Sequence, residues 1–505
     1  MDKFDNCVLL TRVGGFYELY FEQAEEYAPL LNIKLASKKT SAGPVPMAGF
    51  PFFQLDRYLK VLVQDLNRYV AIAEEFPNNA EEKIKSGGLL HDRRVARIIT
   101  TGTLIDENFL DPYENAYVMA VHVSSVFKSV GSSQTSAFEP SSDDTSIGLA
   151  WLDLSTGNFF TQATTLGALS SVLSRICPKE IVLDQDFEAQ KEHVVFSILA
   201  DDHRLITYAP VGELTDISDW SGILASELPE AARETFTNPE IQAGSLLLSY
   251  VEDRLQGLCL KLQPPQRYEN LQNMTIDKNS LRALEVRQTI RGDFFRGSLL
   301  HAIRRTVTKS GSRLLNEWLS APSTSAQIIA SRQDLVARFI EAPDLRDLII
   351  TLLRRSHDSQ RLVQKFALGR GDADDLIGLA STVQATADIV NLLEQSSFSD
   401  SESECLLALT KRIDLRDPLI LARRISEAID EDGIFLQQEV ADSEASQMMA
   451  LAEGILAAEG SPEDASLLRK GKKKRPTSIK EYYAEDNETG SPSATFCVSA
   501  LAHQV

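Results

Sequence analysis

A segment near the N-terminus has residue types that suit contact with nucleic acid. It spans Arg12–Tyr20 and reads RVGGFYELY. Two glycines allow a backbone to turn sharply or to approach a ligand closely. An exposed Phe16 would enter a base step as an apolar wedge, at a cost of roughly a few kcal/mol of unstacking. Because that cost is least where pairing is already defective, such a wedge selects a mispair by deformability rather than by base identity.

Glu18 lies two residues beyond Phe16, so the two side chains share one side if the segment is a strand. A carboxylate close to DNA repels phosphates. We therefore interpret Glu18 as a residue that hydrogen-bonds a base, in its ionised or its protonated form. The same run is also typical of a hairpin that feeds an aromatic core, since short aromatic runs pack in cores more often than they contact ligands. The residue types alone leave both interpretations open.

Motifs that hold nucleotides, metals or catalytic nucleophiles are absent from the sequence. Gly471-Lys472 is followed by two further lysines, so no GxxxxGK[ST] phosphate loop is present, nor the hydroxyl that would hold Mg²⁺. HExxH, GxSxG and GxGxxG after a strand are also absent. The chain itself is therefore not expected to be an enzyme or to hydrolyse ATP.

The composition is that of an ordinary multidomain soluble protein. At 505 residues, three or four domains are expected. A net charge of −21 counts against a surface covered by nucleic acid, but residues 1–105 hold 13 basic and 13 acidic side chains and permit local binding. No run approaches 18 apolar residues, which predicts no membrane span, and the first residues are typical of neither a secretory signal nor a transit peptide. The cysteines lack disulfide or metal-ligand spacing: Cys7, Cys177, Cys259, Cys405 and Cys497.

Three regions would position the N-terminal segment. Residues 1–115 mix strand-like and helical runs, which predicts a small α/β domain; the runs are 8–13, 69–75 and 95–100 for strands, and 21–31 and 54–66 for helices. Strands at 117–123 and 146–163, a helix at 165–175 and a strand at 180–183 predict a second α/β domain with β-β-α-β order, and a Ser-rich stretch at 124–145 is interpreted as an insertion.

From about residue 244 the pattern is helical, which predicts a scaffold with levers. The amphipathic stretches are 245–260, 280–291, 311–319, 328–341 and 345–366. Ser396–Glu404 is acidic and predicts a loop. The basic run Lys470–Pro476 would contact phosphates or lie free in solvent.

Several blocks of sequence carry a specific resemblance by their order and spacing. They are Gly14–Tyr20, Ala24 with Leu30 and Leu31, Lys38–Gly43, Pro46–Pro51 and Arg97–Thr103. This set resembles the mismatch-recognition domain of MutS DNA mismatch-repair proteins, and the run Phe52–Tyr58 is most similar to the fungal mitochondrial members. Further blocks resemble the connector domain and the start of the helical core: Ile147–Gly157, Thr275–Glu285, Gly297–Leu300 and Gly311–Leu315.

The resemblance implies roles for the N-terminal residues. In the family, the Phe of a Phe-x-Glu motif stacks on the mispaired base from the minor groove and the Glu hydrogen-bonds to it; these roles fall to Phe16 and Glu18. Gly14 and Gly15 would permit the close approach. The family usually has Asp where this chain has Gly15, which predicts a looser loop and weaker recognition. Candidate phosphate contacts, from charge and position, are Lys38, Lys39 and Arg57.

The implied fold is multidomain α+β: a small α/β mismatch-recognition domain, an RNase H-like α/β connector domain, and a long all-α core and lever region with the start of a clamp. The expected bounds are 1–113, 114–240 with the insertion at 124–145, 241–430 and 431–489, then an unrelated tail at 490–505. Full-length members continue into an ATPase that binds ATP and Mg and also dimerises. We expect this chain to be truncated before it and to hold no cofactor.

The implied function is binding of mismatched duplex DNA in mismatch repair. A MutS-type dimer is implied for the full-length family, no membrane partner is expected, and the resemblance implies a mitochondrial location with the nucleus as the alternative. The rival interpretation is a helical interaction scaffold with little DNA affinity. The acidic composition favours that rival.

Overall fold

The structure is a computed structural model that describes most of the chain up to residue 433. The described residues are 6–40, 43–77, 91–105, 110–124, 145–200, 204–257, 260–269, 273–292, 294–395, 406–430 and 433. They form two compact units, the first from the described residues up to Gln333 together with Asp358–Gly371, the second from Asp334–His357 and the described residues from Asp372 onward. Most of the Ser-rich insertion, the Lys470–Pro476 run, the clamp and the tail lie outside the described residues.

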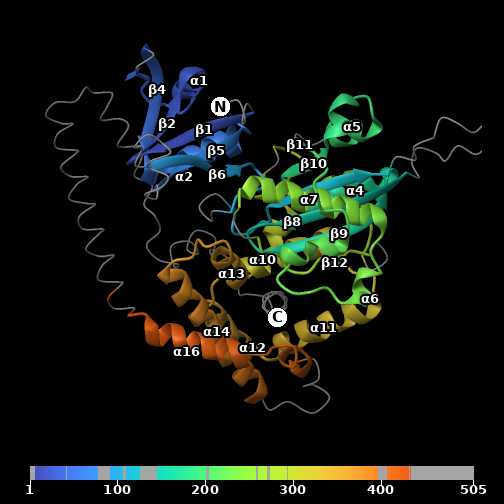
Figure 1. The fold of residues 1–505 in the computed structure, drawn as a ribbon. Coiled ribbons are helices and arrows are strands. Elements are labelled where there is room, and N and C mark those ends of the chain that lie inside the picture. Colours follow the sequence, from blue (N-terminus) through green and yellow to red (C-terminus); the bar gives the residue numbers. More distant parts are fainter. Residues whose placement is uncertain are drawn as a thin grey trace, which may run out of the picture. The chain divides into compact units, whose positions relative to one another are not determined.

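A six-stranded mixed sheet organises the N-terminal part of the first unit (Figure 1). Its order is β3-β4-β2-β1-β5-β6, and all neighbours are antiparallel except β1 and β5. The strands are β1 (Cys7–Val13), β2 (Phe16–Tyr20), β3 (Ala36–Thr40), β4 (Gly43–Pro51), β5 (Tyr69–Pro77) and β6 (His91–Ile99). The strands predicted at 8–13, 69–75 and 95–100 are confirmed with small shifts at their ends.

Helical segments cover this sheet and complete its core. Helix α1 (Phe21–Leu30) buries Ala24, Tyr27 and Ala28 against the strands. The predicted helix at 54–66 is instead a composite of a 3₁₀ turn, α2 (Leu55–Leu59) and a π-helical turn over Lys60–Asp65. Its buried face, Tyr58, Leu59, Leu62 and Val63, still follows the predicted helical spacing.

The second sheet has helices on both faces. Its order is β11-β10-β7-β8-β9-β12, with bounds β7 (Tyr117–Val123), β8 (Ser146–Asp153), β9 (Asn158–Thr165), β10 (Glu180–Asp184), β11 (Leu205–Ala209) and β12 (Gln266–Arg267). Alternate strand residues face opposite cores, because side chains alternate along a strand. Met119 and Val121 pack with α4 (Leu166–Ile176), whereas Val118 and Ala120 pack with α7 (Asn238–Leu255) (Figure 1).

The predicted strand 146–163 is two strands. A tight turn separates β8 from β9, and Gly157 in it has φ +74°. Asp153 fixes the turn, because its carboxylate accepts hydrogen bonds from the backbone N and the hydroxyl of Ser155 at 2.9 and 2.6 Å. The β-β-α-β prediction therefore merged β8 with β9, and it also missed β11 and β12.

The remaining helices of the first unit are shorter than predicted at two places. The 280–291 prediction is wrong beyond Ala283, since Glu285 has φ +49° and cannot continue a helix. The predicted helix 345–366 breaks at residues 354–358 into two helices, one in each unit. Further helices that contain residues of the first unit are α5 (Val194–Leu199), α6 (Glu230–Arg233), α8 (Lys278–Ala283), α9 (Leu299–Ile303), α10 (Lys309–Ser320), α11 (Ala326–Glu341, which continues into the second unit) and α13 (Ser359–Ala367).

The second unit is helical in the residues described. Helix α14 (Ala373–Gln395) packs against α12 (Pro343–Leu353) and α16 (Arg416–Ala428), with Ala380, Ala422 and Ile425 buried between α14 and α16. By length and composition α14 could cross a membrane, which differs from the expectation that the chain has no such segment. Since 44% of its apolar window is buried inside the protein, a core helix accounts for it equally well.

Candidate nucleic-acid interface

The predicted Gly-Gly segment is the tip of the β1–β2 hairpin. Val13 pairs with Phe16, so Gly14 and Gly15 form a two-residue connection. Gly14 has φ +57°, a conformation that hairpin turns with glycine in first place require. Apart from the adjacent residues in the chain, no atom of the described residues lies within 4 Å of where a Cβ would stand at either glycine. The backbone at the tip is therefore open to the close approach of a ligand.

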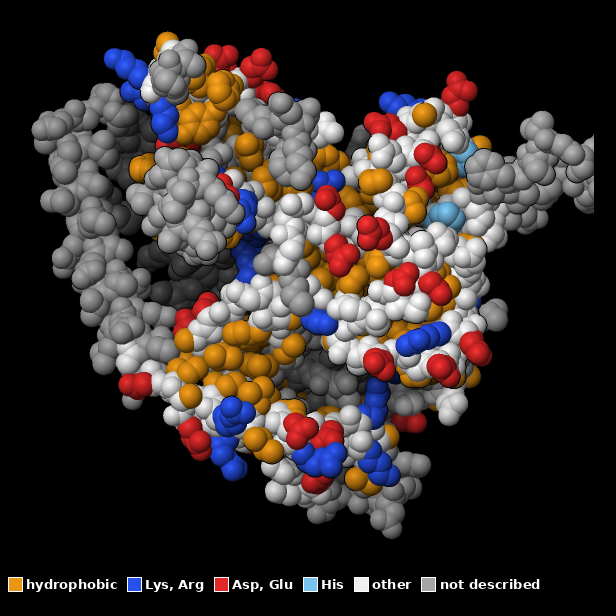
Figure 2. Space-filling view, in the orientation of Figure 1, with side chains coloured by type: hydrophobic (Ala, Val, Ile, Leu, Met, Phe, Trp, Pro, Cys, Tyr) orange, Lys and Arg blue, Asp and Glu red, His pale blue; other side chains and the backbone are white. Residues whose placement is uncertain are grey.

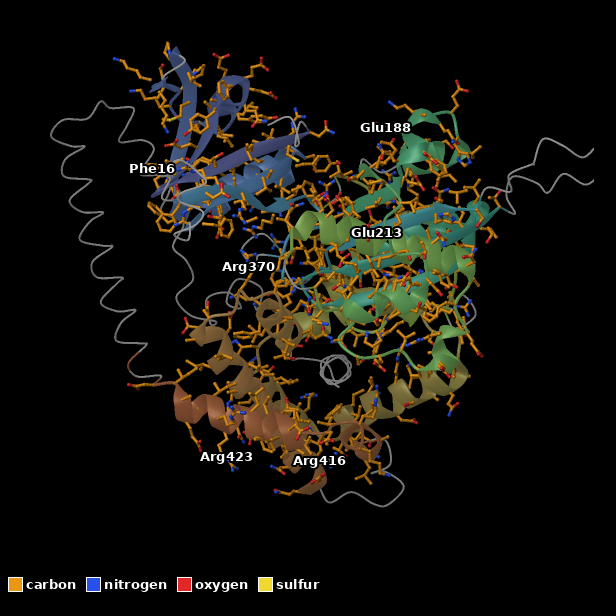
Figure 3. The ribbon with its side chains drawn as sticks, viewed as in Figure 1. Phe16, Glu188, Glu213, Arg370, Arg416 and Arg423 are labelled. Carbon is orange, nitrogen blue, oxygen red and sulfur yellow. The ribbon has the colours of Figure 1, made fainter. Side chains whose placement is uncertain are left out.

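Side chains on β2 alternate between the protein core and the surface, so its first aromatic residue is exposed and its second is buried. Tyr17 and Leu19 are buried, and the Tyr17 ring lies 6.1 Å from that of Phe50. Phe16 faces the other way and is 50% exposed (Figure 3). Tyr17 therefore packs in an aromatic core, as the alternative interpretation expected, whereas Phe16 does not. The prediction that Phe16 and Glu18 lie on one side of an extended strand is confirmed.

Glu18 is held by two neighbours on one of its oxygens. Lys38 Nζ donates to Glu18 Oε2 at 2.9 Å, and the Tyr20 hydroxyl donates to the same oxygen. Lys38 also donates to the Tyr20 hydroxyl at 2.8 Å, and these two hydrogen bonds raise the pKa of Lys38. Among the described residues no hydrogen bond reaches Oε1 of Glu18. The group thus has its charge neutralised and one acceptor left open.

The other basic residues predicted as phosphate contacts are not brought together with Glu18. Lys39 is exposed and follows Lys38 on β3, so its side chain points to the opposite face of that strand. Arg57 is exposed on α2, with its guanidinium 5.7 Å from the ring centre of Tyr58. Lys38 itself pairs with Glu18 rather than standing free. The structure therefore assigns Lys38 a different partner from the one predicted.

Arginine and carboxylate side chains from β1, β5 and β6 hold the hairpin tip from the other side. Arg12 lies 3.4 Å from Glu74, and Glu75 accepts from the backbone N of Gly14 at 3.3 Å and from Arg93 at 2.7 Å. Glu74 also accepts from the Tyr17 hydroxyl at 2.6 Å, and burial together with this bond raises the pKa of Tyr17. These contacts were not predicted, because they join residues from 18 to 62 positions apart in the sequence.

Two further aromatic residues lie beside Phe16 that the sequence reasoning did not single out as contacts. Phe52 and Phe53 are 47% and 71% exposed and follow Pro51, the residue paired with Phe16. The backbone N of Phe52 donates to the Gly15 carbonyl at 2.9 Å. The consecutive aromatic residues Phe52 and Phe53 directly after a strand could have predicted these contacts from the sequence. On the visible face of the N-terminal domain, hydrophobic side chains lie next to Lys and Arg (Figure 2).

No group of three or more His, Cys, Asp or Glu able to hold a metal ion occurs in the part of the chain that the structure describes. Cys7 and Cys177 are free thiols. No GxxxxGK[ST] phosphate loop occurs in the sequence.

Comparison with known proteins gives one consistent result. Three family profiles match, described as MutS domain I over residues 1–108, MutS domain II over 132–264 and MutS domain III over 279–489. The DNA mismatch repair protein MutS of Rhodopseudomonas palustris is 33% identical over 80% of this chain and 42% of its own length. MutS of Nitrobacter hamburgensis is 32% identical over 84% and 45%, and MutS of Microcystis aeruginosa 31% identical over 78% and 43%.

The chain thus spans less than half the length of these relatives. The three matched domains follow one another in order, and the multidomain α+β fold agrees with them. The chain therefore belongs to the MutS family and carries its domains I, II and III.

Proposed function

We propose that this chain binds mismatched duplex DNA through the β1–β2 hairpin, with Phe16 as the wedge and Glu18 as the carboxylate that contacts the base. The observation that carries the proposal is the half-exposed Phe16 ring at an open glycine turn, on a strand whose alternate residues are buried. An apolar side chain in that position can enter a base step.

The ion pair between Glu18 and Lys38 reduces the repulsion expected between a carboxylate and the DNA phosphates. Lys38 lies 2.9 Å from Glu18 and offsets the negative charge that would otherwise repel the duplex. Its open oxygen Oε1 can accept a hydrogen bond from a ring or exocyclic N–H of a base that has lost its partner. A paired base has those donors engaged. Glu18 therefore adds to the selectivity that Phe16 obtains from the cost of unstacking.

Lys39 and Arg57 remain proposed phosphate contacts, since both are exposed. The proposed architecture assigns the second sheet to an RNase H-like connector and the helices after it to core, lever and the start of a clamp, within the bounds given above. A dimer and ATP-dependent switching belong to the proposal only at the level of the family. A mitochondrial location is likewise a proposal from the resemblance.

The rival function is a helical interaction scaffold with little affinity for DNA. The net charge of −21 favours it, because unspecific attraction to phosphates would be weak. The two functions predict different effects of salt concentration on DNA binding. Contact made only through Lys and Arg weakens steeply as salt rises, whereas a wedge in a mispair retains a preference that does not depend on counterions.

Fluorescence anisotropy tests the proposal. The chain is titrated with matched and single-mispair duplexes of the same length at roughly 50 and 150 mM salt, with Phe16→Ala alongside. We expect a preference for the mispair at both salt concentrations that Phe16→Ala removes. Equal binding of both duplexes, unchanged in Phe16→Ala, would leave the scaffold function.

A further inference from the structure

The region next to Phe16 contains an exposed aromatic pair with no role in the function proposed above. Phe52 and Phe53 lie 6.0 Å apart between ring centres, with their planes at 81°. Phe53 is 71% exposed, more than any other large hydrophobic residue among those described. The neighbouring rings of Phe50 and Tyr58 lie 4.1 Å apart inside the core, with their planes tilted by 31°. The chain thus buries its aromatic residues on one side of this turn and exposes Phe53 on the other.

The backbone fixes Phe52 and Phe53 close to the wedge. Pro51 is the register partner of Phe16, and Phe52 N donates to the carbonyl of Gly15 at 2.9 Å. Phe53 is therefore the residue directly after Phe52, whose backbone is hydrogen-bonded to the hairpin tip. Whatever reaches Phe16 and Gly15 also comes within reach of this segment.

A cation fixes the first ring of the pair and leaves the second free. The guanidinium of Arg12 lies 5.1 Å from the centre of the Phe52 ring, and Glu74 holds Arg12 in turn at 3.4 Å. Such a cation–π contact orients the ring. Among the described residues, Phe52 is the only ring recorded against Phe53. Arg12 thus holds the ring of Phe52 in place, whereas the ring of Phe53 is exposed to solvent.

We propose that Phe53 is a second DNA-contacting residue, stacking on a base or sugar of the duplex next to the step that Phe16 enters. The partner is nucleic acid because the pair is continuous with the Phe16 surface and has Arg12 against it. At the step that Phe16 opens, an unstacked base offers its aromatic face to such a ring. The proposal rests on the proposed function, since it needs the hairpin to contact DNA. It extends that function by assigning a residue outside the Phe-x-Glu motif.

Substitution of single rings tests the proposal in the full chain. Phe53→Ala is compared with wild type, Phe16→Ala and the control Phe21→Ala. Phe21 is 51% exposed but lies at the opposite end of β2 from Phe16, and alanine keeps the Cβ that its backbone already accommodates at φ +57°. Dissociation constants are measured by anisotropy for matched and mispaired duplexes, and thermal unfolding checks that each variant is folded.

We expect Phe53→Ala to bind the mispaired duplex about ten-fold more weakly, within the range for loss of one aromatic stacking contact. Phe53→Tyr should bind as wild type does, and Phe21→Ala within about two-fold of it. If Phe16→Ala loses the preference for the mispair but Phe53→Ala binds as tightly as wild type, the role of Phe53 is overturned and the proposed function stands. If wild type shows no preference for the mispair and Phe16→Ala leaves the affinity unchanged, both the proposed function and the role of Phe53 are overturned.

Discussion

Two glutamates on strands of the first unit illustrate how hydrogen bonding separates structural from functional carboxylates. Glu180 on β10 is fully buried and uses both oxygens, one accepting from Thr207 and Tyr250 and the other from Thr100 and Gly102. Glu18 on β2 receives both of its donors on a single oxygen. Each has a tyrosine hydroxyl as partner, yet only Glu18 keeps an acceptor for a ligand.

Both strands have a neighbouring strand on each side, so the difference follows from the donors around each carboxylate. Glu180 is surrounded by donors from several segments, including the Tyr250 hydroxyl on α7 and the backbone N of Gly102. Strand β2 exposes Phe16, and Glu18 on the same side of the strand keeps 13% of its side chain exposed. A carboxylate with every lone pair engaged stabilises the fold, whereas one with an open oxygen is available to DNA. Mutations should therefore act on stability at Glu180 and on binding at Glu18.

The largest expected effect is that of Glu180→Ala. It leaves four buried donors without their acceptor, and each such group costs about 1–3 kcal/mol. We expect the free energy of unfolding to fall by about 4 kcal/mol or more, measured by urea denaturation. A loss below about 1 kcal/mol would show that water replaces the carboxylate and that the site is not sealed.

The buried pair Arg313–Asp358 should behave like Glu180. The guanidinium donates to both carboxylate oxygens at 2.6 and 3.0 Å, and both side chains are buried. Asp358→Asn leaves a buried cation without its partner, and we expect a loss of about 3 kcal/mol in urea denaturation. A variant as stable as wild type would contradict a structural role for the pair.

The same pair predicts a dependence of stability on pH. Burial opposes ionisation of Asp358, but the bond and charge of Arg313 prevail and hold its pKa below the usual 3.8. The pair's contribution is therefore fully present above that value and is lost as the pH falls through the lower folded-state pKa. Urea midpoints measured from pH 7 downward should drop less steeply in Asp358→Asn than in wild type.

At the hairpin, stability effects should be small. Gly14→Ala places a Cβ on a backbone at φ +57°, which costs about 1–2 kcal/mol, whereas Gly15→Ala, with open space around it and no positive φ, should cost close to nothing. Thermal unfolding of the two variants measures this directly. Equal losses at both positions would contradict the turn geometry.

Lys38→Met should leave stability almost unchanged and change binding. The Lys38–Glu18 pair is partly exposed, and such pairs contribute about 0–1 kcal/mol. Without Lys38 the charge of the Glu18 carboxylate is no longer offset and repels phosphates. We therefore expect the variant to bind the mispaired duplex about five-fold more weakly than wild type, the equivalent of about 1 kcal/mol. Equal affinities of the two proteins in fluorescence anisotropy would show that Lys38 does not offset the charge of Glu18.

Local patterns predicted β1, β5, β6, β7 and β10 and covered β8 and β9 as one run, but they missed β3, β4, β11 and β12. Alternation placed Phe16 and Glu18 together, and the strand at 117–123 is confirmed at both ends. Long-range pairing was not predictable. Lys38 reaches Glu18 because β4 lies between β2 and β3 in the sheet, an order that no local pattern contains. The helix break at 354–358 was missed for a similar reason, since Asp358 is engaged by the distant Arg313.

The most direct test of the wedge places 2-aminopurine next to a mispair and follows its fluorescence, which increases when the base unstacks. Wild type should increase the fluorescence of the mispaired duplex and leave the matched one unchanged, and Phe16→Ala should cause no increase at saturating protein. Glu180→Gln, chosen because Glu180 lies outside the hairpin, should act as wild type where it folds. An equal increase with Phe16→Ala would contradict the account, because the duplex would then be opened by something other than the Phe16 ring.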